Sequence, residues 1–152
     1  MSYQKIFNFI QVNDSIATAG QPSVEQLKSL AGAGYQSVIN LATYDKRYSL
    51  EDEAGTVAEL GMAYHHIPVD WEAPQEADFI EFERVMLALP AGKTLIHCAA
   101  NYRVTAFYGL FALKHLGWSE GQLDELRAQI WAGSEFPIWE EFVAKMKLTI
   151  SP

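Results

Sequence analysis

The sequence predicts a single α/β domain over residues 1–152, with a mostly parallel central sheet of about four or five strands flanked by helices. Short apolar, β-prone runs alternate along the chain with longer segments of helical periodicity. The length of 152 residues suits one hydrophobic core. No repeat, low-complexity run or Pro/Gly/Ser-rich linker divides the chain, which favours one domain over two.

The amino-terminal half supplies a hairpin, two helices and two strands. Asn13 and Asp14 are turn residues between β-prone runs, which predicts the hairpin. Ser23, with Gln26 three positions later, forms a capping box for the first helix, and Ser49 is expected to cap the second. Two apolar runs indicate buried strands. The expected ranges are 9–20 for the hairpin, 23 to 32 or 34 and 49–60 for the helices, and 37–42 and 63–69 for the strands.

The carboxyl-terminal half adds one strand and four helices. Apolar residues at helical spacing predict a helix over 75–89. The run KTLIHC predicts a strand over 93–98, which turns after a short loop into a helix over about 103–116. A capping box at Ser119 begins the next helix, and the last begins near Pro137. The aromatic residues expected to pack in the core of this region are Trp131, Phe136, Trp139 and Phe142.

Composition excludes several classes of partner. The net charge of −8 argues against nucleic acid and anionic membranes, since both need a basic face. The longest nearly apolar stretch, Val104 to Leu113, is too short for a membrane span, and the first residues lack the pattern of a signal peptide. Cys98 is the single cysteine, so no internal disulfide can form, and a free thiol makes the cytoplasm the expected location.

The carboxyl ends of the strands are the expected place for a ligand, as in other parallel sheets. Three turns should meet there, at 43–49, 70–74 and 99–102. The most informative sequence is HCAANYRVT at 97–105, because a strand that turns directly into a helix aims unpaired amides and the positive helix end at one point. The sequence therefore predicts an anion site after the strand 93–98.

Cys98 stands at the head of this loop, where the same dipoles favour its thiolate and make it a candidate nucleophile. Arg103, at the far end, can clamp two oxygens of a tetrahedral anion with its planar guanidinium. The residues expected to bind phosphate are Ala99, Ala100, Asn101, Tyr102 and Arg103.

Two further residues are expected to support the loop. His97 would lie behind it and orient backbone or thiolate through a ring N–H. Thr105, in the first helical turn, would donate to the sulfur of Cys98 and help it leave in a second step.

The sequence HCAANYRVT resembles the signature of cysteine-dependent phosphatases, in which His-Cys ends a strand and Arg followed by Ser or Thr opens a helix. Together with TAGQPSVEQLKSLAGAGYQSVINL and ELGMAYHHIPVDWEAP, it resembles the bacterial beta-lactamase-hydrolase-like phosphatase family, relatives of the dual-specificity phosphatases, over about residues 12–116. The resemblance implies a protein-tyrosine-phosphatase-like fold. It also implies hydrolysis of a phosphoric monoester through a cysteinyl-phosphate intermediate, without metal or other cofactor.

Phosphoester cleavage by a thiolate also needs an acid for the leaving oxygen, which the related phosphatases supply from a loop upstream of the cysteine. In VDWEAP, Asp70 follows the preceding strand and is the expected acid, with Glu72 as the fallback. Trp71 and Arg47 are candidates for the pocket wall. The expected partner is a phosphorylated small molecule or a phosphoprotein.

Three departures from the family pattern keep other functions open. Four residues separate Cys98 from Arg103, where the phosphatases usually have five, and Asn101 replaces the usual glycine, although Asn tolerates a left-handed conformation. Ala42 stands where related strands often carry Arg, so Arg47 is the candidate substitute. The four-residue spacing is also typical of single-domain rhodaneses. A sulfurtransferase with a Cys98 persulfide and a catalytically weak phosphate-binding module therefore remain alternatives.

Each candidate also has a purely structural interpretation. Cys98 can be a small buried hydrophobe, and Arg103 a surface residue paired with Glu. Asp70 can cap the helix that follows Pro74. The pair His65-His66 is adjacent on a strand and points to opposite faces, so no metal site is expected there.

Overall fold

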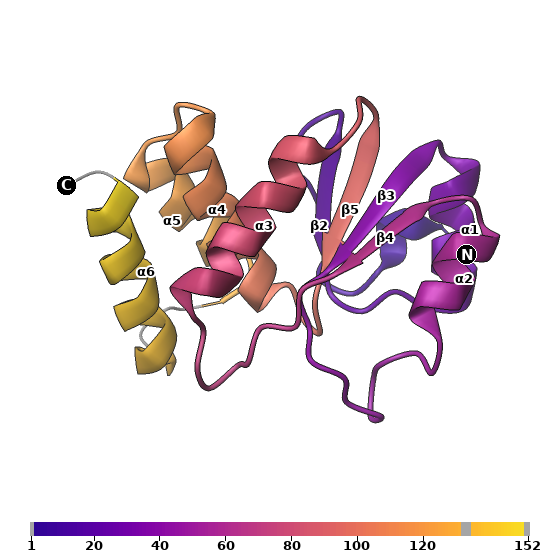
Figure 1. Cartoon of the computed structure of the whole chain (residues 1–152), viewed down its shortest axis with the longest axis horizontal. Coiled ribbons are helices and arrows are strands. Elements are labelled where there is room, and N and C mark those ends of the chain that lie inside the picture. The colour runs from indigo at the N-terminus through magenta and orange to yellow at the C-terminus, as the bar shows by residue number, and fades with distance from the viewer. Residues whose placement is uncertain (1, 132–134, 151–152) are drawn as a thin grey trace.

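The computed structural model describes residues 2–131 and 135–150 and shows an α/β fold with a five-stranded sheet (Figure 1). The sheet order is β1-β2-β5-β3-β4. The strands are β1 (Ile10–Gln11), β2 (Ile16–Ala19), β3 (Tyr35–Asn40), β4 (Ala63–His66) and β5 (Lys93–His97). The helices are the 3-10 helix η1 (Tyr3–Lys5), α1 (Val24–Gly32), α2 (Glu53–Glu59), α3 (Glu76–Ala88), α4 (Tyr102–His115), α5 (Glu120–Ala128) and α6 (Pro137–Ile150).

The sheet is parallel except at one edge. Strands β2, β5, β3 and β4 run parallel to one another, and β1 pairs antiparallel with β2 through the predicted hairpin. This confirms the expected mostly parallel sheet. It also brings the carboxyl ends of four strands to one edge, which is where the chain continues into the predicted loops.

Helices cover both faces of the sheet, because successive strand residues point to opposite sides. Val38 and Leu95 pack on the side of α1 and α2, in a cluster that includes Leu27. Their neighbours Ile39 and Ile96 pack on the opposite side, in the larger cluster of α3 to α6. The sheet is therefore buried on both faces, as a parallel sheet requires.

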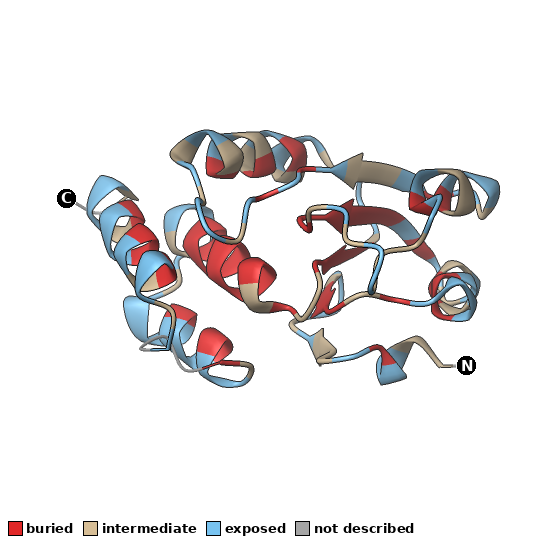
Figure 2. Cartoon of the chain, turned by 90° about the horizontal axis from the view of Figure 1, so that it is seen from below, coloured by how far each residue is buried: buried red, intermediate tan, exposed pale blue. Residues whose placement is uncertain are grey.

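Helix α4 is the central helix of the larger cluster. Every residue from Arg103 to Ala112 is buried, and Figure 2 shows this helix enclosed by other elements. Gly109 lets α5 approach closely, since a Cβ atom there would lie 2.8 Å from Cγ of Leu123. Burial on all sides fixes α4 firmly, and its amino-terminal end begins at the predicted anion-binding loop.

Most local predictions are confirmed, with one wrong helix start. The capping boxes at Ser23 and Ser119 are both present. Ser49 does not cap α2, which begins at Glu53 with Asp52 as its N-cap. The hydroxyl of Ser49 instead accepts a hydrogen bond from the amide of Asp45. Ser49 therefore braces the loop that follows β3, and the strands β3 and β4 end earlier than the predicted positions 42 and 69.

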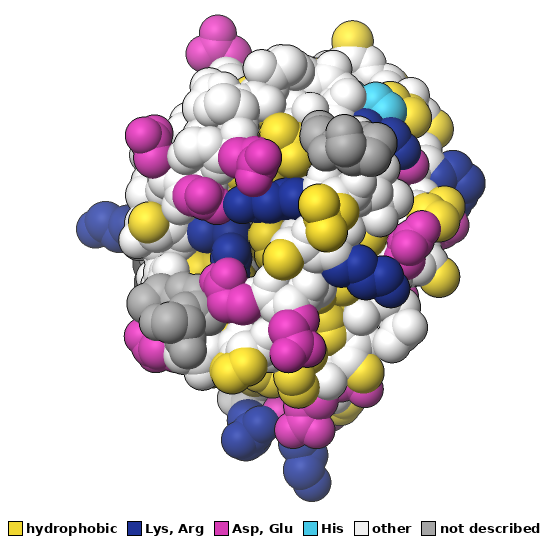
Figure 3. All heavy atoms as spheres, turned by 90° about the vertical axis from the view of Figure 1, so that its left-hand side faces the viewer, with side chains coloured by type: hydrophobic (Ala, Val, Ile, Leu, Met, Phe, Trp, Pro, Cys, Tyr) yellow, Lys and Arg dark blue, Asp and Glu magenta, His cyan; other side chains and the backbone are white. Residues whose placement is uncertain are grey.

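Helices α5 and α6 close the carboxyl-terminal side of the molecule. Their faces are joined by ion pairs from Lys147 to Asp124 and from Arg127 to Glu140. Figure 3 shows acidic and basic side chains interspersed on this side. Among the described residues, the helices are all too short or too polar to cross a membrane.

Candidate active site

A cavity of about 520 Å³ opens at the carboxyl end of β5. It brings together Cys98 and Arg103, at the two ends of the loop after β5, and Asp70 from the segment after β4. The other residues that line it are Thr43, Asp45, Arg47, Tyr48, Trp71, Glu72, Ala99, Ala100, Tyr102 and Phe136. The three turns expected to meet at this edge therefore do so.

The loop between β5 and α4 has the form of an anion cradle. Asn101, the N-cap of α4, has φ of 70°. This is the left-handed conformation that glycine adopts readily and Asn tolerates. Within the described residues, the backbone amides of Ala99, Ala100, Tyr102 and Arg103 donate no hydrogen bond. Free amides at a helix start attract an anion, so the loop has the donors that the sequence predicted.

Arg103 is a buried charge on the cavity wall, with only 6% of the residue exposed. Its Nε donates to the carbonyl of Val69 at 2.9 Å, and its guanidinium lies 5.5 Å from the ring centre of Trp71. The bond to Val69 is the one hydrogen bond that the Arg103 side chain makes to residues 2–131 and 135–150, so Nη1 and Nη2 are left free. The interpretation of Arg103 as a surface residue paired with Glu is wrong, and its free nitrogens suit an anion in the cavity.

Cys98 lies at the floor of the cavity and is fully buried by its neighbours. Its amide donates to the carbonyl of Ala19 at 3.3 Å, which fixes the head of the loop against β2. Its carbonyl lies 3.1 Å from Nδ1 of His97, so His97 supports the loop from behind, as predicted.

Glu53 is a site residue that sequence reasoning missed. Its Oε2 lies 2.6 Å from Nε2 of His97, and its Oε1 accepts a hydrogen bond from Gln21. Both ring nitrogens of His97 face acceptor oxygens. The first residue of α2 thus orients the histidine behind Cys98. Glu53 and His97 are 44 positions apart, and no local sequence pattern indicates that they meet.

The charge of Glu53 gives the first testable prediction. Burial raises the pKa of Glu53, but the charge and hydrogen bond of His97 and the hydrogen bond of Gln21 outweigh burial and leave the pKa below its ordinary 4.5. A carboxyl with a depressed pKa stabilises the fold above its unfolded pKa and loses that effect as pH falls through the folded pKa. We expect Glu53→Gln to lower the free energy of unfolding by about 1–3 kcal/mol at neutral pH.

Urea unfolding of both proteins, repeated at acid pH, measures this effect. The gap between wild type and Glu53→Gln should shrink as pH drops below 4.5. Glu51→Gln is the matched control, because Glu51 is an exposed acid two residues earlier. A gap that stays constant with pH would show that ionised Glu53 does not stabilise the fold.

Thr105 does not contact the sulfur of Cys98, so that prediction is wrong. Its hydroxyl lies 3.0 Å from the carbonyls of Asn101 and Tyr102, and it accepts a hydrogen bond from Nε1 of Trp131 at 3.1 Å. The hydroxyl therefore bonds to the backbone at the start of α4 and to the side chain of Trp131. Thr105 holds the helix start instead of serving the thiol.

Asp70 is exposed on the cavity wall, on the segment that follows β4. Its Oδ1 accepts a hydrogen bond from the amide of Glu72, which also lines the cavity. The N-cap of α3 is Gln75, so the interpretation of Asp70 as the cap of that helix is wrong. Asp70 therefore has the position that an acid facing the cavity needs.

The carboxyl-terminal helices fix the segment that carries Asp70. Nε1 of Trp139 donates to the carbonyl of Trp71 at 2.8 Å, and the two rings stack with centres 5.3 Å apart. Phe136 lies edge-on to Trp71 and is partly buried against the larger core cluster, and it also lines the cavity. The tail thus shapes the wall of the site as well as the core.

Arg47 lies at the rim of the cavity, and its guanidinium is paired with Asp45. Its side chain is 84% exposed, and its Nε lies 3.0 Å from each carboxylate oxygen of Asp45. The hydrogen bonds from Arg47 lower the pKa of Asp45 to about 2. Arg47 lines the cavity, as expected for a wall residue, but its guanidinium is already paired.

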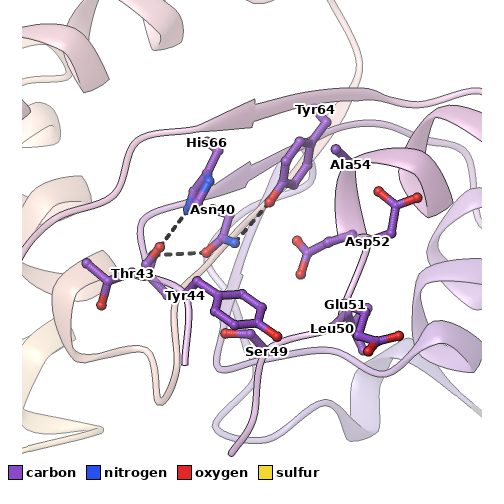
Figure 4. A pocket seen from close by; sticks show the side chains of 12 residues that line it. Asn40, Thr43, Tyr44, Ser49, Leu50, Glu51, Asp52, Ala54, Tyr64 and His66 are labelled. Carbon is purple, nitrogen blue, oxygen red and sulfur yellow. Dashed lines mark hydrogen bonds between the residues drawn. The ribbon is translucent and has the colours of Figure 1, made fainter. Parts of the chain in front are cut away.

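A second cavity, of about 170 Å³, shares Thr43 with the first and lies over the other side of the loop after β3 (Figure 4). The amide of Asn40 donates to the hydroxyl of Tyr64, and Nε2 of His66 lies 2.6 Å from the carbonyl of Ala42. Burial and the charge of Glu53 raise the pKa of Tyr64 to about 12. Since neither Cys98 nor Arg103 lines this cavity, the larger one is the candidate active site.

Known proteins resemble the chain over its whole described fold. No family model matches the sequence. A protein of Shewanella putrefaciens CN-32, described as "Putative phosphatase (DUF442)", is 30% identical, with a TM-score of 0.86 over 98% of this chain and 97% of its own. The chain belongs to the DUF442 family.

Two other known proteins are similar to the DUF442 chain, and the first confirms the resemblance that the loop and its flanking sequences indicated. The "Beta-lactamase hydrolase-like protein" of Xylella fastidiosa is 30% identical over 104 residues, which are 66% of this chain and 24% of that protein. The chain therefore spans about a quarter of the length of the curated relatives that it matches. Tk-PTP in its active form shares the fold, with a TM-score of 0.78 at 20% identity. The protein-tyrosine-phosphatase-like fold is thus confirmed.

Proposed function

We propose that this DUF442 protein hydrolyses phosphoric monoesters through a cysteinyl-phosphate intermediate. One observation carries the proposal: Asp70, from the segment after β4, lines the same cavity as Cys98 and Arg103 of the loop after β5. Cys98 supplies a nucleophile, Arg103 a fork of free donors, and Asp70 an acid. Free loop amides beside Arg103 complete the set that phosphoryl transfer needs.

In the first step the thiolate of Cys98 attacks phosphorus, forming an S–P bond while the P–O bond to the leaving group breaks. Asp70 gives its proton to the leaving oxygen, which departs as an alcohol or phenol. The loop amides and Arg103 stabilise the three equatorial oxygens, where charge develops. In the second step water attacks phosphorus, Asp70 takes its proton, and inorganic phosphate leaves with the thiolate restored.

The proposed substrate is a phosphorylated small molecule or a phosphoprotein side chain. Trp71, Tyr102 and Phe136 give one side an aromatic surface, with ring centres of Tyr102 and Trp71 5.8 Å apart. Such a surface suits an apolar or aromatic group next to the phosphate. The free thiol of Cys98 fits action in a reducing compartment such as the cytoplasm.

The leaving group provides a direct test. We expect the wild type to hydrolyse both an activated aryl phosphate and an alkyl phosphate in the presence of a chelator. Asp70→Asn should slow the alkyl ester by about 10²-fold or more, because its poor leaving group needs the proton. The same variant should slow the activated ester far less. Equal losses on both esters would remove Asp70 as the acid.

Sulfur transfer is the second candidate, because four residues separate Cys98 from Arg103. A sulfurtransferase would gain one sulfur atom on Cys98 from thiosulfate and lose it to cyanide, with no phosphate turnover. Measuring the intact mass after incubation with an aryl phosphate or with thiosulfate distinguishes the two functions. A phosphoryl adduct with the aryl phosphate and no adduct with thiosulfate would support the phosphatase.

A further inference from the structure

Two asparagines in the described residues share an unusual backbone conformation. Asn8 has φ of 53° and Asn101 has φ of 70°, and they are the two non-glycine residues there with positive φ. They lie 93 positions apart, yet each donates its side-chain amide to the other's segment. Asn8 Nδ2 donates to the carbonyl of Ala100, and Asn101 Nδ2 donates to the carbonyl of Asn8, both at 2.9 Å.

The end of β2 joins the same two segments through its backbone. The amide of Gly20 donates to the carbonyl of Phe7 at 2.7 Å, and the amide of Gln21 donates to the carbonyl of Ala99 at 3.0 Å. A Cβ atom on Gly20 would lie 2.6 Å from the Ala99 carbonyl oxygen, so glycine is required for this approach. The amino-terminal arm, residues 3–9, is therefore bonded to the phosphate-binding loop directly and through β2.

The bonds control where the loop carbonyls point. The carbonyls of Ala99 and Ala100 accept from Gln21 and Asn8, neither of which lines the active-site cavity. A carbonyl oxygen turned into the cavity would repel an anion. Because a peptide unit is planar and trans, the amide of Ala100 lies on the side opposite the Ala99 carbonyl. That amide has no partner in the described part of the chain.

The orientation of Asn101 is fixed as well. Its side chain is fully buried, and Nδ2 also donates to the hydroxyl of Thr18 at 3.0 Å. Turning the amide over would place its oxygen against the carbonyl of Asn8. The bonded arrangement therefore has one orientation, which favours a single shape of the loop.

We propose that Asn8 is a positioning residue for the phosphate-binding loop, holding the carbonyl of Ala100 away from the bound anion. This inference rests on the proposed function. Asn8 does not line the active-site cavity, and it acts through Ala100 and Asn101. The amino-terminal arm is thus part of the support of the site, although it lies far from Cys98 in the sequence.

The test replaces Asn8 with Gly, which keeps positive φ accessible and removes only the side-chain bond. Asn13→Gly is the matched control, because Asn13 also holds a backbone turn, accepting from the amides of Ser15 and Ile16 at 2.8 and 2.9 Å. Two readouts are needed. The first, called loop exchange, is hydrogen exchange of the amides of Cys98 and Gln21, which donate across the contact between β2 and the loop. The second is the affinity for inorganic phosphate by calorimetry.

We expect Asn8→Gly to speed exchange of the Cys98 and Gln21 amides and to weaken phosphate binding by about tenfold, the loss of one hydrogen bond to the loop. It should raise KM and lower kcat for an aryl phosphate, while Asn13→Gly changes none of these. Loop exchange equal to that of the wild type would overturn the role of Asn8. A wild type without phosphate binding or turnover would overturn the proposed function instead, and loop exchange would still decide the role of Asn8.

Discussion

Replacing Cys98 with Ser is expected to reduce turnover of an aryl phosphate by about 10⁴-fold or more, since an alcohol at this position stays protonated and attacks poorly. Affinity for inorganic phosphate should be kept, because Arg103 and the loop amides are unchanged. Serine has nearly the volume of cysteine, so the buried floor of the cavity stays filled. Steady-state kinetics and calorimetry on the same preparations measure both quantities.

A chemical experiment on the wild type gives an independent reading of the same thiol. Cys98 is the single cysteine of the chain, so alkylation by iodoacetate reports on it alone. Inorganic phosphate should protect the thiol and slow inactivation in proportion to its occupancy. Turnover that survives in Cys98→Ser, or inactivation that phosphate leaves unchanged, would contradict the covalent mechanism.

The convergence of the site could be predicted from the sequence, because it follows from the fold. Parallel strands end at one edge, so the segments that carry Asp70, after β4, and Cys98, after β5, leave the sheet on the same side, with β3 between the two strands. The left-handed conformation of Asn101 also followed from local chemistry, since Asn is one of the few residues that tolerate it.

The supporting contacts could not be predicted, because they join segments far apart in the chain. Glu53 meets His97 across 44 positions and Asn8 meets Ala100 across 92, and neither pair leaves a local pattern. Thr105 shows the opposite case. Its place in the motif suggested a contact with sulfur, but the position of Trp131, set by the packing of the tail, decides its hydrogen bonds.

The second large effect is expected at Arg103. Arg103→Lys keeps a positive charge but loses the planar fork and the Nε bond to the carbonyl of Val69. A lysine cannot both hold that carbonyl and clamp two phosphate oxygens. We expect phosphate affinity to fall by at least about tenfold, and kcat/KM by about 10³-fold, because charge on the equatorial oxygens grows in the transition state.

Arg47→Lys is the matched control, because Arg47 lines the same cavity. Its guanidinium is paired with Asp45 and its side chain is 84% exposed, so an anion bound in the loop should gain little from it. Changes in phosphate affinity and kcat/KM should stay within about threefold, the scale of an exposed ion pair. If Arg47→Lys lost as much as Arg103→Lys, the anion would have to bind at the rim, too far from Cys98 for in-line attack. The difference between the two arginines therefore tests where the phosphoryl group is held, separately from whether the thiol reacts.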